Sequence, residues 1–458
     1  MPKFQSLKGF RDFYPEDFAK RAYIADTWRR IARQHGFIEY DAPPLESLEL
    51  YRHKSGDELV GQLYSFVDKG GREVALRPEM TPSVARMVSA RWQSLPKPVK
   101  WFSIPQLFRY ERPQAGRLRE HFQLNADIFG DASPKAEAEI LALVIRMFKA
   151  FGLGSTDVTI RLSDRRVLNE VLGRIGVADS QINGVYTVLD KLHRVDRADS
   201  VTKLERLGLS ADVIEQLFAS VAAFGNATDN VALGKLLGES DAFTSMLRLL
   251  TDLVVDAREW IKIDLTIVRG LGYYTGTVFE AFDAKEEFRA ICGGGRYDGL
   301  LESLGGTDAP AIGFGWGDVV LTDLLDRAGK FPAPDPATDI VVAVSEEPQR
   351  DVSSSVRRLW DAGVRAGPAT VAQANKWLAS GGKGAPARFV CVLLGDTRLT
   401  HSIVIDVAEG KSYRHAQADS LVSALEDFHA SNGRPPGVPD IRVTVQNLST
   451  SAIAHDEP

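Results

Sequence analysis

The sequence predicts an α+β fold, in which a mostly antiparallel sheet is flanked by helices, interrupted by a helical insertion and followed by a small α/β domain. Strand and helix patterns alternate irregularly over the first 130 residues, and without a regular βαβ repeat we expect antiparallel strands. A strand pattern of alternating polar and apolar residues covers 121–130, and helical patterns dominate 165–262. The 458 residues suffice for about three domains.

The first elements expected along the chain are an amphipathic helix, a hairpin and a second helix. Apolar residues recur with helical spacing over 17–35, and Gly36 follows the last turn. Residues 63–79 predict a hairpin that turns at Gly70-Gly71, before a helix that begins near Thr81. This mixed order fits the α+β class.

Two longer strands are expected at 101–111 and 121–130, joined by a polar loop. Gln123, Asn125 and Asp127 share one face of the second strand, and Arg109 and Glu111 share a face of the first. A half-exposed sheet with a surface ion pair would explain this pattern. The loop adds further arginines, which favour a polyphosphate ligand because phosphate oxygens prefer forked, permanently charged donors. These are Arg112, Arg117 and Arg119.

Alternating prolines at 332, 334 and 336 predict a stiff linker before the last domain. The expected segments are a first core part at 1–164, a helical insertion at 165–262, a second core part at 263–330, a linker at 331–338, an α/β domain at 339–430 and a loosely ordered polar tail at 431–458.

Charge and motif content exclude several classes of protein. The formal net charge of −6 excludes nucleic-acid binding by bulk charge, so any polyanion needs a local patch. The segment 100–120 has a local charge of +3, and 351–400 has a local charge of +4. Neither a dinucleotide-binding nor a P-loop glycine pattern is present, and the glycines of GFGWG at 313–317 fit tight packing.

The two cysteines lie far apart in the sequence, and the eight histidines are scattered, so we expect neither disulfides nor a metal cluster. No stretch reaches the roughly 18 apolar residues of a membrane helix, and the N-terminus has no signal-peptide pattern. We therefore expect a cytoplasmic protein without a membrane partner.

Four motifs, carried by five segments, together resemble a known family. FRYERPQAGRLREHFQLNADIFG at 108–130 resembles motif 2 of class II aminoacyl-tRNA synthetases in its histidyl form. RGLGYYTGTVFEAF at 269–282 and GGGRYDGL at 293–300 resemble the histidyl-specific signature, and LKGFRDFYPED at 7–17 and LRPEMTPSVARMV at 76–88 also match. The order of the segments is that of the family.

The resemblance implies a class II catalytic core and a C-terminal anticodon-binding domain. It implies ATP-dependent activation of L-histidine to histidyl-adenylate, and transfer of the histidyl group to the 3′ end of its tRNA. It also implies a homodimer, and Mg²⁺ that accompanies ATP, although no carboxylate cluster in the sequence identifies metal ligands.

On the ATP side, the resemblance implies that Arg109 holds the α-phosphate and that Arg269 stands opposite it. Glu111 would meet the adenine amino group, and Arg117 would reach the outer phosphates. Fixed cations on both sides of the α-phosphorus would stabilise the charge that develops during attack by the histidine carboxylate.

On the amino-acid side, the resemblance implies that Glu79 binds the ammonium group of histidine, and that Asp127 accepts a hydrogen bond from the imidazole. The remaining residues implied for this pocket are Thr81, Gln123, Tyr273 and Tyr274. Because adjacent strand residues face opposite sides, one tyrosine of the pair is expected in the core.

The third class II motif and the histidyl-specific signature depart from the family pattern in this sequence. Val319 and Val320 stand where the third class II motif has an acid and an arginine that meets the γ-phosphate, and Gly272 replaces an acid of the signature. Val320 favours an alternative function, a non-catalytic paralogue such as the histidine-sensing regulatory subunit of ATP phosphoribosyltransferase. The arginines and the α/β domain after residue 338 favour the enzyme.

Overall fold

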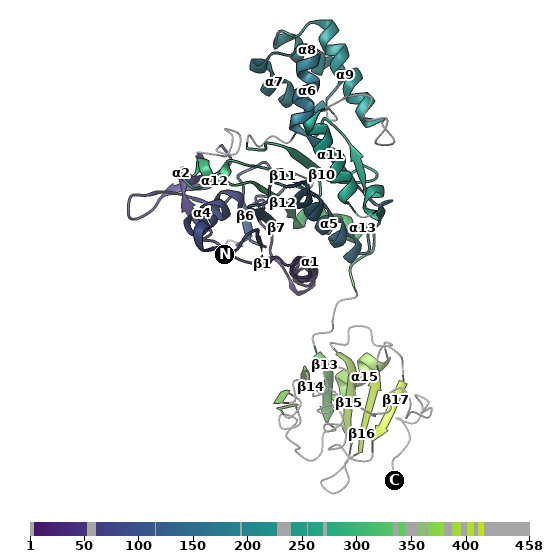
Figure 1. Cartoon of the computed structure of the whole chain (residues 1–458). Coiled ribbons are helices and arrows are strands. Elements are labelled where there is room, and N and C mark those ends of the chain that lie inside the picture. Colours follow the sequence, from purple (N-terminus) through teal and green to yellow (C-terminus); the bar gives the residue numbers. More distant parts are fainter. Residues whose placement is uncertain are drawn as a thin grey trace. The chain divides into compact units, whose positions relative to one another are not determined.

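The computed structural model divides into two compact units, Met1–Pro332 and Ala333–Pro458, and Figure 1 shows both. The residues that it describes are 4–52, 61–114, 116–192, 195–226, 240–253, 255–268, 273–332, 338–344, 356–357, 360–361, 365–379, 387–394, 401–406 and 411–415. Each unit has its own sheet, and each is described by itself.

A nine-stranded sheet forms the centre of the described part of the first unit. Its order is β1-β5-β7-β12-β11-β10-β8-β9, with β6 paired to β7. The bounds are β1 Ile38–Glu39, β5 Val99–Ser103, β6 Gln106–Phe108, β7 Glu120–Phe129, β8 Val158–Asp164, β9 Ile261–Ile263, β10 Thr277–Asp283, β11 Cys292–Arg296 and β12 Ala311–Gly317. The β1–β5 and β8–β9 pairs are parallel and the other pairs are antiparallel. The prediction of a mostly antiparallel sheet is confirmed.

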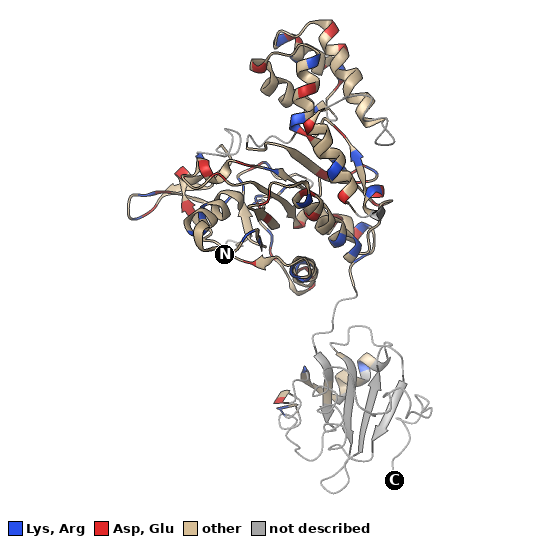
Figure 2. Cartoon of the chain, in the orientation of Figure 1, with Lys and Arg blue, Asp and Glu red and all other residues tan. Residues whose placement is uncertain are grey.

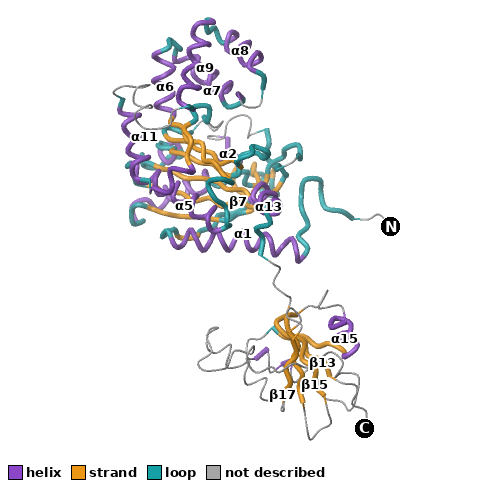
Figure 3. The backbone as a smooth tube through the Cα atoms, turned by 90° about the vertical axis from the view of Figure 1, so that its right-hand side faces the viewer, coloured by secondary structure: helices purple, strands orange, loops and turns teal. Residues whose placement is uncertain are grey.

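Helices cover one face of this sheet. They are α1 Pro15–Gln34, α5 Pro134–Ala150 and α13 Asp318–Arg327. Figure 3 shows them gathered around β7, and the fully buried Trp316 of β12 packs its ring 4.3 Å from that of Phe148 on α5. A second buried cluster lies with α4 Thr81–Arg91 and α12 Leu300–Ser303 and includes Tyr297. The sheet therefore has apolar packing on both sides.

A small three-stranded sheet, of order β2-β4-β3, precedes α4. Its elements are β2 Leu45–Ser47, α2 Leu48–Arg52, β3 Ser65–Val67 and β4 Glu73–Leu76, and η1 Trp92–Ser94 follows α4. The Asp68 carboxylate accepts hydrogen bonds from the backbone amides of Gly70 and Arg72, and Gly71 has a positive φ of 78°. The hairpin and the helix start at Thr81 are confirmed.

Helices make up most of the described chain between β8 and β9, and in Figure 1 α6–α9 stand together at one end of the unit. Their bounds are α6 Arg165–Arg174, α7 Asp179–Leu189, α8 Arg197–Arg206, α9 Ala211–Gly225, α11 Asp241–Asp252 and η3 Val255–Trp260. Asp164, Ser210 and Ser240 cap α6, α9 and α11 by accepting from backbone amides. Residues 261–263, of which we placed 261 and 262 in the insertion, form β9 of the central sheet.

The expected strand 101–111 is broken in the structure. Pro105 has no N–H to donate, and the chain divides into β5, which pairs with 125–129, and β6, which pairs with 120–122. β6 ends at Phe108, so Arg109 and Glu111 lie beyond the ladder. Our expectation that they share a strand face was wrong.

The second unit contains a five-stranded sheet of order β14-β13-β15-β16-β17. Its elements are β13 Thr338–Val344, β14 Ala366–Thr370, α15 Val371–Ala379, β15 Ala387–Leu394, β16 His401–Asp406 and β17 Lys411–His415. β13 is parallel to β14 and β15, and the last two strands are antiparallel additions. The tail 431–458 lies outside the described residues. Over the described part of the chain, no helix has the length and apolarity needed to cross a bilayer.

Candidate active site

A row of polar side chains on β7 forms the centre of the site. Gln123, Asn125 and Asp127 alternate with buried Leu124 and Ala126, as the sequence predicts. The neighbouring strand β12 has glycines beside this row. A Cβ added at Gly313 would lie 2.0 Å from Oδ1 of Asp127, and one at Gly315 would lie 2.6 Å from Nε2 of Gln123. The glycines of GFGWG thus make room for the polar row.

Asp127 is a buried carboxyl group that has one hydrogen bond. The Tyr297 hydroxyl donates to its Oδ1 at 2.5 Å, and its buried Oδ2 has no hydrogen-bond partner. Burial raises the pKa of Asp127 to about 7, and the bond from Tyr297 opposes that shift. Burial and the nearby Asp127 raise the pKa of the Tyr40 hydroxyl well above its ordinary value. The unsatisfied Oδ2 can accept one more donor.

A second buried carboxylate, Glu79, stands beside the same tyrosines. The Tyr273 hydroxyl donates to Oε2 of Glu79 at 3.2 Å, and the ring of Tyr273 lies 5.9 Å from that of Tyr297. Tyr273 and Tyr297 therefore link the surroundings of Glu79 and Asp127. Tyr274 is buried in the apolar cluster near α4, as expected for one member of the pair.

Thr81 and Gln123 complete the residues expected for an amino acid. Thr81 is half-buried at the first position of α4, two residues after Glu79. The Gln123 side-chain amide donates to Oδ1 of Asn125 at 2.7 Å. His121 precedes Gln123 on the same strand face, and burial together with the charge of Arg109 lowers its pKa to about 3. Its imidazole is therefore neutral at pH 7.

The arginines expected for ATP lie at the end of β6 and in the following loop. Arg109 donates from Nε to the Pro78 carbonyl at 2.9 Å, which fixes it beside the segment of Glu79. Glu111 is buried and forms an ion pair with Nε of Arg117 at 2.7 Å. Two residues with separately expected roles are thus paired with each other.

Other contacts hold this loop against the N-terminal segment. Arg119 donates from Nε to the Glu111 carbonyl at 3.2 Å, and its backbone amide donates to the Gly9 carbonyl at 2.9 Å. Arg11 lies 2.7 Å from Glu120 and 3.0 Å from Asp318 at the start of α13. The segment 7–17 therefore braces β7 and α13.

The charge count of 100–120 overstates the positive patch. Lys100 contacts the His35 carbonyl and forms an ion pair with Glu139 of α5, so it does not extend the arginine loop. Figure 2 shows both basic and acidic residues along the helices of the first unit. The arginines of the loop and of the end of β6 carry the local positive charge.

Two site predictions have different outcomes. Arg269 and Gly272 lie outside the described residues, so the role of Arg269 stays a prediction. Val320 is described, and its side chain is 8% exposed on α13. An aliphatic group therefore occupies the position where the family pattern has an arginine.

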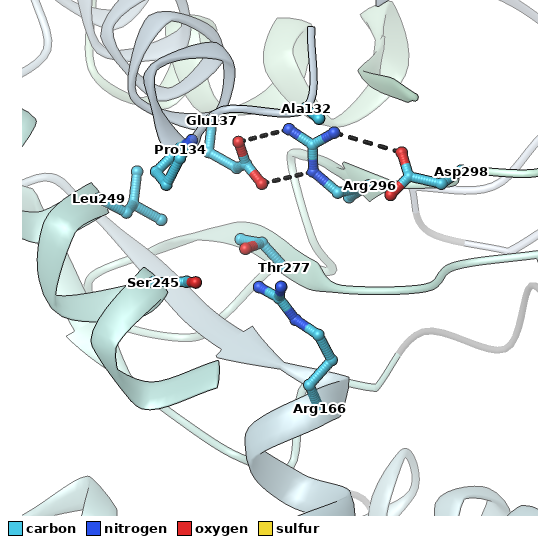
Figure 4. A pocket seen from close by; sticks show the side chains of 9 residues that line it. All are labelled: Ala132, Pro134, Glu137, Arg166, Ser245, Leu249, Thr277, Arg296 and Asp298. Carbon is cyan, nitrogen blue, oxygen red and sulfur yellow. Dashed lines mark hydrogen bonds and ion pairs between the residues drawn. The ribbon is translucent and has the colours of Figure 1, made fainter. Parts of the chain in front are cut away.

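A cavity of about 100 Å³ lies on the helix-covered side of the sheet and not at the polar row. In Figure 4, Arg296 and Glu137 face each other above Thr277, and Arg166 reaches toward them from α6. The Arg296 guanidinium donates two hydrogen bonds of 2.6 Å to Glu137 and one of 3.2 Å to Asp298. These charged groups pair with one another. The row on β7 instead has an acceptor without a partner, Oδ2 of Asp127, so we take that row as the candidate active site.

Sequence analysis did not single out three residues of the site: Tyr40, His121 and Tyr297. Tyr297 belongs to the quoted segment GGGRYDGL, and its neighbouring glycines are the signal that marks a crowded backbone there. Tyr40 follows β1, and no pattern in the sequence links it to Asp127. His121 has the strand parity of Gln123, which was a usable signal.

This architecture defines a class of protein. A mostly antiparallel sheet and a β6–β7 hairpin that carries arginines and acids are the features of the class II aminoacyl-tRNA synthetase core, and the helical segment between β8 and β9 is an insertion in it. Residues 9–317 match the family model described as "Histidyl-tRNA synthetase", and the chain belongs to this family.

Known proteins similar to the chain carry the same designation. It is 47% identical over 361 residues to a histidine–tRNA ligase of Opitutus terrae, covering 77% of this chain and 82% of the relative. It is 44% identical over 347 residues to one of Haloarcula marismortui, with coverages of 74% and 78%. The solved structure of a histidyl-tRNA synthetase from a Nostoc species has a TM-score of 0.77 and 24% identity, over 93% of this chain and 99% of that one, and shows the shared fold.

Proposed function

We propose that the protein uses ATP to activate L-histidine as histidyl-adenylate and transfers the histidyl group to the 3′ end of its tRNA. The observation that carries this proposal is the buried Oδ2 of Asp127, which lacks a hydrogen-bond partner, whereas Oδ1 of the same carboxyl group accepts from the Tyr297 hydroxyl. The N–H of an imidazole would satisfy Oδ2. Amino acids without such a donor would leave it unpaired, at a cost of about 1–3 kcal/mol.

The first chemical step is in-line attack by the histidine carboxylate on the α-phosphorus, with pyrophosphate as the leaving group. A P–O bond to the carboxylate forms as the bond to the β-phosphate bridging oxygen breaks. Arg109, fixed by the Pro78 carbonyl, would neutralise charge on the α-phosphate oxygens, and Arg269 would do so from the opposite side. Glu79 would hold the ammonium group.

The ion pair between Glu111 and Arg117 supports their proposed roles as a pair. Glu111 would accept from the adenine amino group, and Arg117 would contact the outer phosphates. Binding of both ends of ATP would exchange this ion pair for contacts with the nucleotide.

In the second step, a terminal hydroxyl of the tRNA attacks the activated carbonyl and releases AMP. We propose that the α/β unit after residue 338 binds the anticodon. Arg357, Arg365 and Lys376 lie within the segment of local charge +4. Because neutralised phosphates release counterions, tRNA affinity should fall steeply with salt.

Mg²⁺ is proposed as the companion of ATP. Among the described residues, no group of three His, Cys, Asp or Glu side chains could hold a metal ion. This fits an ion bound chiefly through nucleotide phosphates, and magnesium commonly binds in this way. When bound, it would neutralise charge on the leaving pyrophosphate.

A homodimer in the cytoplasm completes the proposal and rests on the family resemblance. Light scattering of the purified chain at micromolar concentration tests the dimer, since a monomer would have the mass of 50.3 kDa. Such a mass, unchanged on adding histidine and ATP, would contradict the dimer.

The experiment that tests the function is histidine-dependent exchange of pyrophosphate into ATP, followed by charging of tRNA. We expect both. Saturable histidine binding without exchange would contradict the proposal and support the alternative that Val320 favours, a histidine-sensing paralogue without catalysis.

A further inference from the structure

Three segments that lie far apart in the sequence meet at Gly116 of the arginine loop. A Cβ added there would lie 3.2 Å from Cγ2 of Val320 and 3.9 Å from Cδ of Arg289. Val320 belongs to α13, and Arg289 belongs to the connection between β10 and β11. The stem of Arg289 and the uncharged Val320 thus flank the same turn of the loop.

The backbone that carries Arg289 is fixed on both sides. Asp283 is buried and accepts hydrogen bonds from the amides of Glu287 and Phe288, at 3.1 and 3.0 Å. The Ile291 amide donates to the Ala281 carbonyl at 2.7 Å. Arg289 itself is half-buried. An arginine on a backbone held in this way loses little conformational freedom when it binds a ligand.

The surroundings of Arg289 favour an anionic ligand. Gly116 has a positive φ of 71° and directly precedes Arg117, whose nearest acid is the buried Glu111. A turn with an arginine on either side concentrates forked cationic donors, as a polyphosphate requires. Val320 brings no charge to this place.

We propose that Arg289 binds the outer phosphates of ATP across the turn at Gly116, on the side that Val320 leaves uncharged. The inference rests on the proposed function, because it assigns a further phosphate-binding residue to the same reaction. It requires that the pyrophosphate end of ATP lie between the loop and the β10–β11 connection, with Arg117 and Arg289 on opposite sides.

Pyrophosphate exchange with varied ATP at saturating histidine tests this role. We compare the wild type with Arg289→Ala, with Arg289→Lys, which keeps the charge, and with Lys285→Ala, an exposed cation of the same connection. We expect Arg289→Ala to raise KM for ATP by about tenfold or more and the KM for histidine by less than about twofold. The KM for ATP of Arg289→Lys should lie between those of the wild type and Arg289→Ala, and that of Lys285→Ala should match the wild type.

A second measurement separates the outer phosphates from the rest of the site. A non-hydrolysable analogue of histidyl-adenylate has no outer phosphates, so Arg289→Ala should bind it as tightly as the wild type does. An unchanged KM for ATP, or an equal loss of affinity for the analogue, would overturn the inference. If Arg289→Ala does not fold, Arg289→Gln supplies an uncharged side chain of similar length.

Failure of the proposed function would look different. A wild type without exchange would contradict the function, and calorimetric titration of ATP into the same variants would still decide the role of Arg289. In that titration, equal ATP affinities of the wild type and Arg289→Ala would overturn the proposed role of Arg289. Absence of ATP binding by the wild type would overturn it too.

Discussion

Arg296 and Tyr297 are adjacent in the chain, yet they serve opposite faces of the central sheet. On the helix-covered face, Arg296 is held by Glu137 and Asp298, and each charge has a partner from the same protein. On the other face, Tyr297 donates to Asp127, whose second oxygen has no partner. A buried polar cluster that satisfies itself holds the fold together, whereas one that leaves an acceptor open is suited to a ligand.

The largest expected effect is on the helix-covered face, where the buried charges pair with one another. Arg296→Ala should lower the free energy of unfolding by about 3–5 kcal/mol, because it leaves Glu137 buried without its cation. Urea denaturation measures this. The double variant Arg296→Met, Glu137→Leu should recover most of the loss, since it removes both charges. A loss below about 1 kcal/mol for Arg296→Ala would mean that water reaches this cluster.

Substitution of Arg269, whose catalytic role is a prediction, should lower the reaction rate and leave the stability almost unchanged. Arg269→Ala should slow pyrophosphate exchange by about a hundredfold or more, because it removes a cation that stabilises the transition state. The midpoint of thermal unfolding should change little. Arg174→Ala, on the exposed side of α6, is the control. A near-normal rate would show that Arg269 does not meet the α-phosphate.

Substitution of Asp127 should change the affinities for the two substrates, histidine and ATP, by different amounts. Asp127→Ala should weaken histidine binding by about tenfold or more and ATP binding much less, because the imidazole loses its acceptor. Separate titrations of histidine and ATP measure the two affinities, with the exposed Asp26→Asn as the control. Equal losses for both ligands would indicate a structural acid, like those of the opposite face.

The polar row should also give the unliganded protein a pH-dependent stability. Since burial raises the pKa of Asp127 to about 7, the folded protein keeps a proton that the unfolded chain releases near pH 4. Stability should therefore fall between pH 4 and 7, by at most about 1.4 kcal/mol per pH unit, and this contribution should level off above pH 8.

Chemical denaturation of the wild type and Asp127→Asn at several pH values isolates that contribution. Relative to wild type, the asparagine variant should gain stability as the pH rises from 4 to 7. A difference that does not change with pH would contradict the raised pKa.

The sequence predicted the polar row of β7 because strand periodicity is local: Gln123, Asn125 and Asp127 follow from spacing alone. It also predicted the hairpin at Gly70-Gly71, where the turn chemistry lies within a few residues. It did not predict the break of the expected strand at Pro105, although proline gave a local signal that we did not weigh.

The partners of the polar row could not be predicted, because they come from distant segments. Tyr297 lies 170 residues from Asp127, and Arg289 reaches Gly116 through the tertiary fold. Likewise, the basic residues counted in one segment do not all belong to one patch, since Lys100 is turned toward α5. A count of charges along the chain does not show in which direction each side chain points.

The glycines beneath the polar row have a consequence for evolution of the site. An added Cβ would meet Asp127 from Gly313, Gln123 from Gly315, and at 2.5 Å the Thr277 carbonyl from Gly295. Main chain therefore lies directly beside the polar row, and a side chain added at any of these glycines would have to displace a neighbour. A deep mutational scan should find Gly313 and Gly295 intolerant of other amino acids, because an added Cβ would meet backbone oxygens there, whereas Gly315 should be more tolerant, because the flexible end of Gln123 can move. New ligand preferences would have to arise at the tyrosines near Asp127 and Glu79, which are Tyr40, Tyr273 and Tyr297.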